Sequence, residues 1–391
     1  MLPEFYINYL KSYLKDSELL TLQILVWLLQ VHKEVKIEKL ASNFPYPIKC
    51  DSRRKKIKRF LILPVLSVTL LWLPLIKKII ETQFKPGETL TVIIDRTQWE
   101  KNNILMASVV WNNRALPLYW LLLNKQGATN FYEQVAVIKP ILRLLKKYKI
   151  VVIGDREFRS TALASWLGKK KVGYIFRLNK TTKIKPKYQK YQALKDLQIK
   201  PGDRIIYPRS LVTEENLKDR FNVVIYWKRK YKNQQNPEPW YLITNLQNKD
   251  EVIKLYSQRM AIEAMFRDYK KGGYNLEGTK ANEQRLTSLI LLVAHRASLG
   301  SREGEIAYTF SSLKGLKIRK IGHQEYINRL KDKEDKYSKH SYFWTGLYGS
   351  TWVLGMDICW EWVEKLMRTT RNKLPFYQKG LRAMELIQRR L

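Results

Sequence analysis

Hydrophobic positions divide the chain into a helical beginning, a central region of short apolar runs and a helical end. In residues 1–85 apolar side chains recur at helical spacing, most clearly over residues 19–29 and 38–44. From residue 89 onward, β-branched runs bounded by turn residues predict buried strands instead. The order β-β-β-α-β-α-β predicts an α/β fold with a mixed sheet. Its strands are expected at 89–94, 104–111, 115–123, 149–154 and 172–178, and its helices at 132–148 and 161–167.

Residues 180–250 are polar and basic, and their short strand-like stretches predict a β-rich insertion, with strands at 204–207, 221–227 and 240–244. One long helix is expected over residues 250–271, with Asp250 as its N-cap and a glycine pair ending it. We therefore predict three regions: a helical domain at 1–88, an α/β domain at 89–280 that includes the insertion, and a helical region at 281–391.

The net charge of the chain indicates what kind of partner it binds. The chain of 391 residues carries 72 Lys and Arg against 35 Asp and Glu, a formal net charge of +37. So large an excess repels itself in a compact protein, which favours a polyanionic partner, nucleic acid first and an anionic membrane surface second. Residues 91–280 hold 37 of the basic and 16 of the acidic residues, so the central domain itself is expected to bind the polyanion.

Other features exclude several classes of protein. The two cysteines, Cys50 and Cys359, lie far apart, and the four histidines are scattered, so zinc and disulfide frameworks have little support. No signal peptide is recognisable, because charges interrupt the N-terminal segment. Residues 60–76 form an apolar run, but it is short and contains two prolines, so core helices are favoured over a membrane segment.

Two aspartates follow predicted buried strands directly: Asp95 after TLTVII and Asp155 after IVVIG. Carboxylates there are poorly solvated, and two such strands side by side bring like charges together unless a cation lies between them. Hard carboxylate oxygens suit Mg²⁺ or Mn²⁺. A turn or N-cap aspartate is the alternative at each position, and Glu157 is expected to be structural rather than a further ligand.

A third carboxylate, Glu263, lies in the predicted long helix. At helical spacing Tyr256, Arg259, Glu263 and Lys270 fall within a sector of roughly 60°, beside an apolar face. An exposed ion pair between Arg259 and Glu263 would explain that pair alone. Together with the two aspartates, the glutamate completes a set of carboxylates that could hold two metal ions for phosphodiester cleavage, with cations nearby to bind phosphates.

The spacing Y-x2-R-x3-E-x6-K, formed here by Tyr256, Arg259, Glu263 and Lys270, resembles the signature of the insertion-sequence-four family of DDE transposases. IDRTQW around Asp95 and GDREF around Asp155 resemble that family's two aspartate motifs, in the same order. The resemblance covers about residues 90–280. It implies a ribonuclease-H-like catalytic core with a β-rich insertion, flanked by helical regions, in which Asp95, Asp155 and Glu263 are catalytic and bind two Mg²⁺ ions, with Mn²⁺ able to substitute.

The resemblance further implies cut-and-paste transposition through a DNA hairpin, with double-stranded transposon ends and target DNA as partners. Trp240 matches the aromatic position on which a flipped base stacks, and Trp227 is the second choice. Tyr256, Arg259 and Lys270 match residues that hold phosphates near the cleaved end. A homodimer is expected, with residues 360–391 carrying its contact. The protein is expected in the bacterial cytoplasm, associated with the nucleoid and not with a membrane.

The N-terminal region does not resemble the better-known family members, so its DNA-reading residues are a separate hypothesis. A basic cluster there is the candidate contact: Arg53, Arg54, Lys55, Lys56, Lys58 and Arg59. Three alternatives stay open. They are a transposase relic retained as a DNA-binding regulator, another ribonuclease-H-fold nuclease such as a junction resolvase, and a protein that binds membrane surfaces.

Overall fold

The computed structural model forms two compact units, and each is considered by itself. We call residues 80–270 the sheet unit, and residues 1–79 together with 271–391 the helical unit. The structure describes residues 4–32, 35–44, 50–99, 101–213, 219–229, 238–270, 273–279, 281–296, 307–327, 341–347, 349–350, 353 and 374–389.

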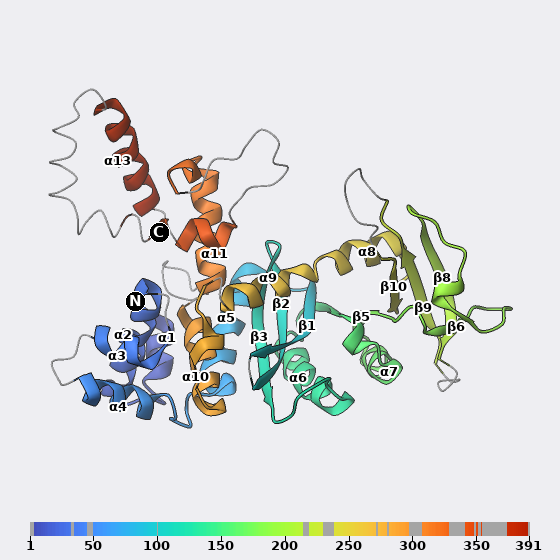
Figure 1. Ribbon diagram of the computed structural model, residues 1–391, viewed down its shortest axis with the longest axis horizontal. Helices are drawn as coiled ribbons and strands as arrows, with labels where there is room; N and C mark the ends of the chain where they lie inside the picture. Colours follow the sequence, from blue (N-terminus) through green and yellow to red (C-terminus); the bar gives the residue numbers. More distant parts are fainter. Residues whose placement is uncertain are drawn as a thin grey trace. The chain divides into compact units, whose positions relative to one another are not determined.

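The sheet unit is built on one ten-stranded sheet of order β3-β2-β1-β4-β5-β10-β9-β8-β6-β7 (Figure 1). The five strands expected from the apolar runs all form, and β1 extends five residues further than the run predicted because it continues to pair with β2. β1 pairs in parallel with β4, and β4 with β5, so the sheet is mixed as expected. These strands are β1 (Thr89–Trp99), β2 (Asn102–Trp111), β3 (Arg114–Leu123), β4 (Lys149–Gly154) and β5 (Gly173–Arg177).

The basic segment after β5 continues the same sheet. β10 pairs antiparallel with β5 and so joins the strands of residues 180–250 to the first five. Three of these strands lie where the sequence predicts them, and two short ones were not expected. Their bounds are β6 (Lys183–Lys185), β7 (Gln192–Ala193), β8 (Arg204–Val212), β9 (Phe221–Tyr226) and β10 (Trp240–Thr244).

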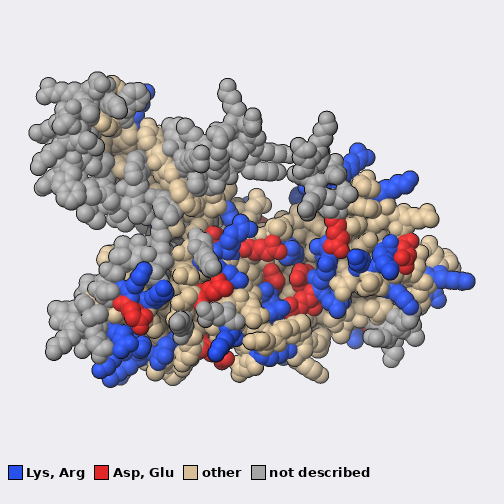
Figure 2. Space-filling model, viewed as in Figure 1, with Lys and Arg blue, Asp and Glu red and all other residues tan. Residues whose placement is uncertain are grey.

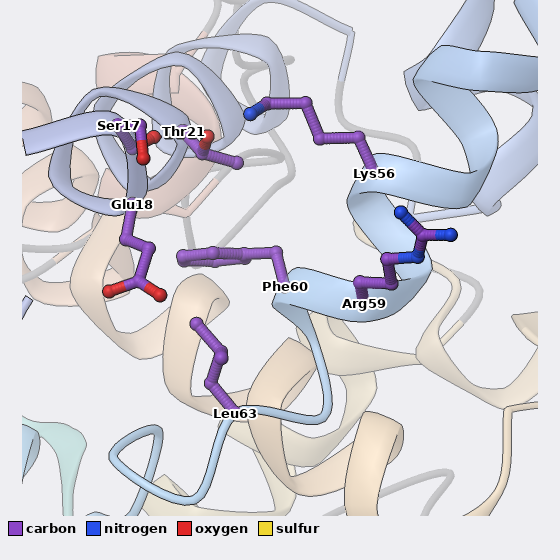
Figure 3. Close-up of a pocket in the computed structure, with 7 residues that line it drawn as sticks. All are labelled: Ser17, Glu18, Thr21, Lys56, Arg59, Phe60 and Leu63. Atoms are coloured by element: carbon purple, nitrogen blue, oxygen red, sulfur yellow. Dashed lines mark hydrogen bonds between the residues drawn. The ribbon is translucent and has the colours of Figure 1, made fainter. Parts of the chain in front are cut away.

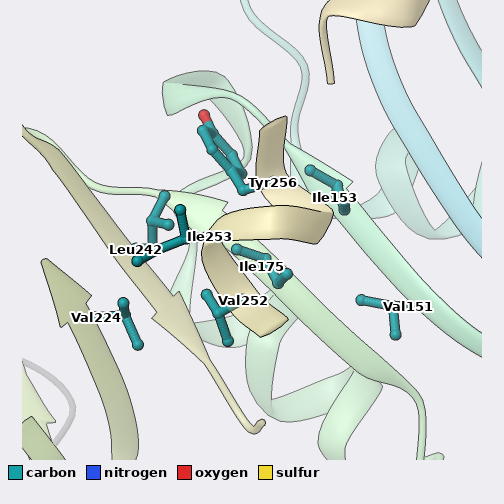
Figure 4. Close-up of a cluster of buried hydrophobic side chains, with 8 residues drawn as sticks. All are labelled: Val151, Ile153, Ile175, Val224, Leu242, Val252, Ile253 and Tyr256. Carbon is teal, nitrogen blue, oxygen red and sulfur yellow. The ribbon is translucent and has the colours of Figure 1, made fainter. Parts of the chain in front are cut away.

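Four helices accompany the sheet: α6 (Phe131–Leu144), α7 (Thr161–Lys169), α8 (Lys249–Ser257) and α9 (Met260–Tyr269). A capping box begins α6, in which Asn130 accepts from the Glu133 backbone amide and Glu133 accepts from the Asn130 amide. α8 packs its apolar side on the sheet, where Val252, Ile253 and Tyr256 meet residues of β4, β5, β9 and β10 (Figure 4).

The prediction of one long helix over residues 250–271 is wrong. The α-helical hydrogen-bond pattern ends at Ser257 and resumes at Met260. Gln258 and Arg259 keep right-handed helical backbone angles, but their amides bond carbonyls three residues back. The N-cap of α8 is Asn248 rather than Asp250, because the Asn248 side chain accepts hydrogen bonds from the amides of Asp250 and Glu251. α9 ends at Tyr269, and the expected stop at Gly272 lies outside the described residues.

The described parts of the helical unit contain helices and no strand. The apolar run at 60–76 spans the end of α4, a turn, a π-helical turn and the start of α5, and about half of its residues are buried. Among the described residues no helix is long and apolar enough to cross a membrane. The main helices are α1 (Glu4–Leu10), α2 (Asp16–His32), α3 (Ile37–Asn43), α4 (Cys50–Phe60), α5 (Leu73–Gln83, which continues into the sheet unit), α10 (Glu283–Arg296), α11 (Ala307–Lys320) and α13 (Leu374–Gln388).

Candidate active site

Asp95 and Asp155 lie side by side at the end of the parallel ladder. The last paired residues are Ile94 with Gly154 and Gly154 with Phe176, so Asp95, Asp155 and Arg177 each follow one member of a single row. Side chains at equivalent positions of neighbouring strands lie on the same face of a sheet. The register therefore places two carboxylates and one guanidinium together at this edge.

The turn after β4 fixes Asp155. Its Oδ1 accepts the Glu157 amide at 2.9 Å, which caps a single 3₁₀ turn over residues 156–158. Gly154 leaves room for the buried Phe158 ring, because a Cβ on Gly154 would lie 2.8 Å from Phe158 atoms. A larger residue at 154 would displace either the ring or the aspartate, which accounts for glycine in GDREF.

Asp95 lies in an electrostatically unfavourable place for a carboxylate. Burial, and then the charges of Asp155 and Glu263, raise its pKa to about 7, although the Arg96 amide and the Arg259 guanidinium act in the opposite direction. The Arg96 amide donates to Asp95 Oδ1 at 2.8 Å. Three carboxylates thus share one field, and a bound cation would relieve their repulsion.

Glu263 reaches this field from the first turn of α9. Its Oε1 pairs with Arg259 Nη2 at 2.7 Å, so the expected i,i+4 ion pair is present. Burial acts to lower the pKa of Arg259, but Tyr256 and Glu263 outweigh it and the pKa is raised. The helix break at Gln258 puts Arg259 at the N-cap position of α9, and Asp95 also interacts electrostatically with this arginine.

Glu157 holds the loops around the aspartates in place. Its Oε2 pairs with Arg96 Nε at 2.8 Å, and its Oε1 accepts from both the amide and the hydroxyl of Thr129 at 2.8 Å. Arg96 also donates to Asn103 at 3.2 Å. Both carboxylate oxygens of Glu157 thus have protein partners, which tie the turn after β4 to β1 and to the loop before α6.

The two aromatic residues predicted to contact DNA pack against each other. Trp240, at the start of β10, meets Tyr256 edge to face at 5.0 Å between ring centroids and meets Tyr226 at 5.6 Å. Trp240 is partly exposed, whereas Tyr256 is only 2% exposed. Figure 4 shows the Tyr256 hydroxyl pointing away from the apolar cluster. Burial raises the pKa of Tyr256 to about 12, while Arg259 and Arg177 partly offset this.

Lys270 ends α9 beside β1, where its Nζ donates to the Gln98 carbonyl at 3.3 Å. Figure 2 shows several Asp and Glu side chains close together on the sheet unit, with Lys and Arg side chains beside them. The signature residues are thereby brought to one region of the sheet unit, but on two short helices rather than on one face of a single helix.

The N-terminal cluster belongs to the helical unit. α4 carries it along its middle and last turn. Arg54 lies 3.9 Å from Glu38, Lys55 is exposed, and nothing is described for the Arg53 side chain. Lys56 borders a cavity of about 450 Å³ between α2 and α4 (Figure 3). The other lining residues are Ser17, Glu18, Thr21, Arg59, Phe60 and Leu63.

The acidic site fits a divalent metal by its chemistry, but it is not a closed cage. Among the described residues no three carboxylate, histidine or cysteine side chains converge closely enough to hold an ion. Glu263 Oε1 is instead paired with Arg259. The oxygen-only donor set suits a hard cation, and a bound cation would relieve the repulsion that raises the pKa of Asp95.

A second group of charges beside Asp155 was missed in the sequence. Arg156 and Arg177 both pair with Glu238, the latter at 3.1 Å. Burial, and then the charge of Arg156, lower the pKa of Arg177. The aspartates were identified because each directly follows a predicted buried strand. The same reasoning applies to Arg177, which is the last residue of β5. Nothing in the sequence pattern indicates Glu238, which comes from a distant segment.

A mixed α/β sheet that places carboxylates among arginines at one edge has the chemistry to act on phosphodiesters. The sequence comparison gives the family: the model described as "Transposase DDE domain" matches residues 88–297, and the chain belongs to this family. The protein is therefore a DDE transposase, a metal-dependent enzyme that cuts and transfers DNA.

The remaining comparisons add only distant likenesses. A structure of the piggyBac transposase synaptic complex with hairpin DNA is 11% identical and covers 76% of this chain and 77% of its own, with a TM-score of 0.40. A structure of Marinitoga piezophila Argonaute with 5′ OH guide RNA and target DNA is 11% identical and covers 71% and 37%, with a TM-score of 0.22. The comparison with curated proteins gave no match.

Proposed function

We propose that this chain catalyses cut-and-paste transposition of an insertion sequence and that Asp95, Asp155 and Glu263 hold its two metal ions. The observation that carries the proposal is that Asp95 and Asp155 follow the last paired residues of two neighbouring parallel strands. In addition, the charge of Glu263 helps to raise the pKa of Asp95. The Y-x2-R-x3-E-x6-K spacing supports membership of the insertion-sequence-four group, and the mixed sheet supports a ribonuclease-H-like core. Mg²⁺ is the proposed ion, with Mn²⁺ able to substitute.

Bound metal would supply an activated water or hydroxyl and stabilise the leaving oxygen. The chain's own residues position the DNA. Arg259 exchanges Glu263 for a DNA phosphate, which frees the glutamate to join the aspartates. Lys270, at the end of α9, neutralises a further phosphate. Tyr256 holds the Trp240 ring in position through the edge-to-face contact of the two rings.

Water first cleaves a phosphodiester at each transposon end and leaves a 3′-hydroxyl. That hydroxyl attacks the opposite strand and forms a hairpin, water opens it, and the restored 3′-hydroxyls attack target DNA. Trp240 stacks on the base that the tight hairpin expels. In this proposal the helical unit reads the terminal repeats through α4, two copies of the chain pair two ends, and the reaction takes place on the bacterial nucleoid. Of the proposed dimer contact, residues 374–389 are described, and α13 (Leu374–Gln388) forms nearly all of this stretch.

A gel analysis of the products tests this proposal. The substrate is an end-labelled duplex with the terminal sequence of the flanking element, incubated with Mg²⁺ or Mn²⁺. We expect a nicked strand first and then a product that migrates as a hairpin under denaturing conditions. Nicking without a hairpin would limit the proposal to hydrolysis. Tight binding without any cleavage would favour a regulatory relic.

A further inference from the structure

Three charged side chains beside Asp155 form a group that the catalytic proposal leaves without a task. Arg156 follows Asp155 in the turn after β4, Arg177 ends β5, and Glu238 comes just before β10. Both arginines pair with the same Glu238 carboxylate, and Arg177 also donates to the Pro239 carbonyl at 3.4 Å. Two cations thus converge on one anion.

The single carboxylate leaves this group incompletely satisfied. The Nε–H groups of Arg156 and Arg177 are buried and have no hydrogen-bond partner among the described residues. A buried donor without an acceptor is destabilising, and two guanidiniums this close repel each other. The group therefore favours a ligand with more acceptor oxygens than one carboxylate offers.

The position of the group identifies that ligand. Arg177 occupies the same row as Asp95 and Asp155, and it interacts electrostatically with Arg259 and Tyr256. Arg156 and Arg177 lie next to the carboxylates, so a DNA strand with a phosphodiester at the carboxylates would bring a neighbouring phosphate close to them. A backbone phosphate matches guanidinium geometry through paired hydrogen bonds and carries its negative charge on two free oxygens.

We propose that Arg156 and Arg177 form a binding site for a DNA backbone phosphate and that Glu238 occupies this site in the DNA-free protein. Glu238 acts as an internal competitor, which DNA displaces when it binds. The inference rests on the proposed function, since it assumes that the DNA strand lies at Asp95 and Asp155. Because Glu238 is about 43% exposed at its side chain, it can leave the arginines without a rearrangement of the core.

Glu238→Gln tests the competition, because it keeps the side-chain shape and removes the charge. Asp250→Asn is the matched control: Asp250 pairs with Arg204 at 2.8 Å, also on the surface of the sheet unit. The affinity for the labelled end duplex is measured without divalent metal, so that no cleavage occurs. We expect Glu238→Gln to tighten binding about three- to tenfold and Asp250→Asn to change it by less than about twofold.

Two further measurements assign the effect to the arginines. The gain from Glu238→Gln should disappear in the double variant with Arg177→Gln. Replacing single phosphates of the cut strand by uncharged methylphosphonates should weaken binding by the wild type at one position, and this penalty should vanish in Arg177→Gln. An unchanged or weaker affinity of Glu238→Gln would overturn the inference, as would an equal gain in Asp250→Asn.

Cleavage of the same duplex with Mg²⁺ separates this inference from the proposed function. If the wild type cuts the duplex and Glu238→Gln binds no tighter, only the internal competitor is refuted. If the wild type binds and does not cut, the catalytic proposal fails while the binding result for Glu238→Gln still decides the phosphate site.

Discussion

Asp95 and Asp155 follow Ile94 and Gly154, the last residues paired between the parallel strands β1 and β4. The backbone register alone thus brings two carboxylates together, and the burial of one of them makes their proximity unfavourable without a cation. The account of this transposase rests on that relationship, and the predictions below test its consequences.

Asp95→Asn should stabilise the metal-free protein in a pH-dependent way. The folded-state pKa of Asp95 is about 7, above its ordinary value of 3.8. The folded protein therefore binds more protons than the unfolded chain between these values, and its stability falls as pH rises toward 7. Asparagine removes this penalty, so the variant should gain roughly 1–4 kcal/mol over wild type at pH 8 and little at pH 4. Urea unfolding in the presence of a chelator measures it, and a gain independent of pH would contradict the account.

Divalent metal should raise the melting temperature of the wild-type protein. A ligand that binds only the folded state adds about 2.7 kcal/mol of stability at a concentration of 100 times its dissociation constant. Asp155→Asn should lose most of the shift caused by Mg²⁺ or Mn²⁺. KCl at matched ionic strength is the control, and an equal shift in wild type and variant would show that the ions bind elsewhere.

Gly154→Ala should impair both stability and cleavage. The added Cβ would lie 2.8 Å from Phe158, whose ring is fully buried, so we expect a loss of about 1–3 kcal/mol and a displaced Asp155. Phe158→Leu in the same chain should restore part of the loss. Gly168→Ala, within α7, is the control. Its Cβ would lie 3.9 Å from the nearest atom of the Tyr174 ring, which is an ordinary van der Waals contact. Similar effects at both glycines would refute the steric explanation.

Trp240→Ala should slow hairpin formation or opening about tenfold more than first-strand nicking, since stacking on a flipped base involves only the hairpin. Trp240 also packs on Tyr256 and Tyr226, so truncation removes packing as well. Trp240→Phe retains an aromatic surface and should recover most of the hairpin steps. Quenched-flow analysis of the separate products would contradict the stacking role if every step slowed equally.

The sequence predicted the elements whose signal is local. The apolar runs located all five strands of the first part of the sheet, because buried strands require them. The strand-end rule then placed Asp95 and Asp155 correctly beside each other. The break between α8 and α9 could not be predicted, since residues 250–271 have helical spacing throughout and the packing of Tyr256 on Trp240 is tertiary.

The features that the sequence did not predict depend on contacts between distant segments of the chain. Arg177 and Glu238 meet only because β10 pairs with β5, with Leu242 opposite Arg177, and nothing near residue 238 in the sequence indicates that register. The division into units differs from the three predicted regions for the same reason: helices from both ends of the chain form one unit, as in the hydrogen bond from Ser288 to the Leu61 carbonyl.

The most direct test of the central claim is metal-dependent cleavage of the terminal duplex by Glu263→Gln beside wild type. Glu251→Gln is the matched control, because Glu251 is an exposed glutamate in the first turn of the neighbouring helix α8. We predict that Glu263→Gln binds the duplex like wild type but cuts it at least about 1,000-fold more slowly, whereas Glu251→Gln cuts normally. Cleavage by Glu263→Gln at the wild-type rate would contradict the assignment of Asp95, Asp155 and Glu263 as the catalytic carboxylates.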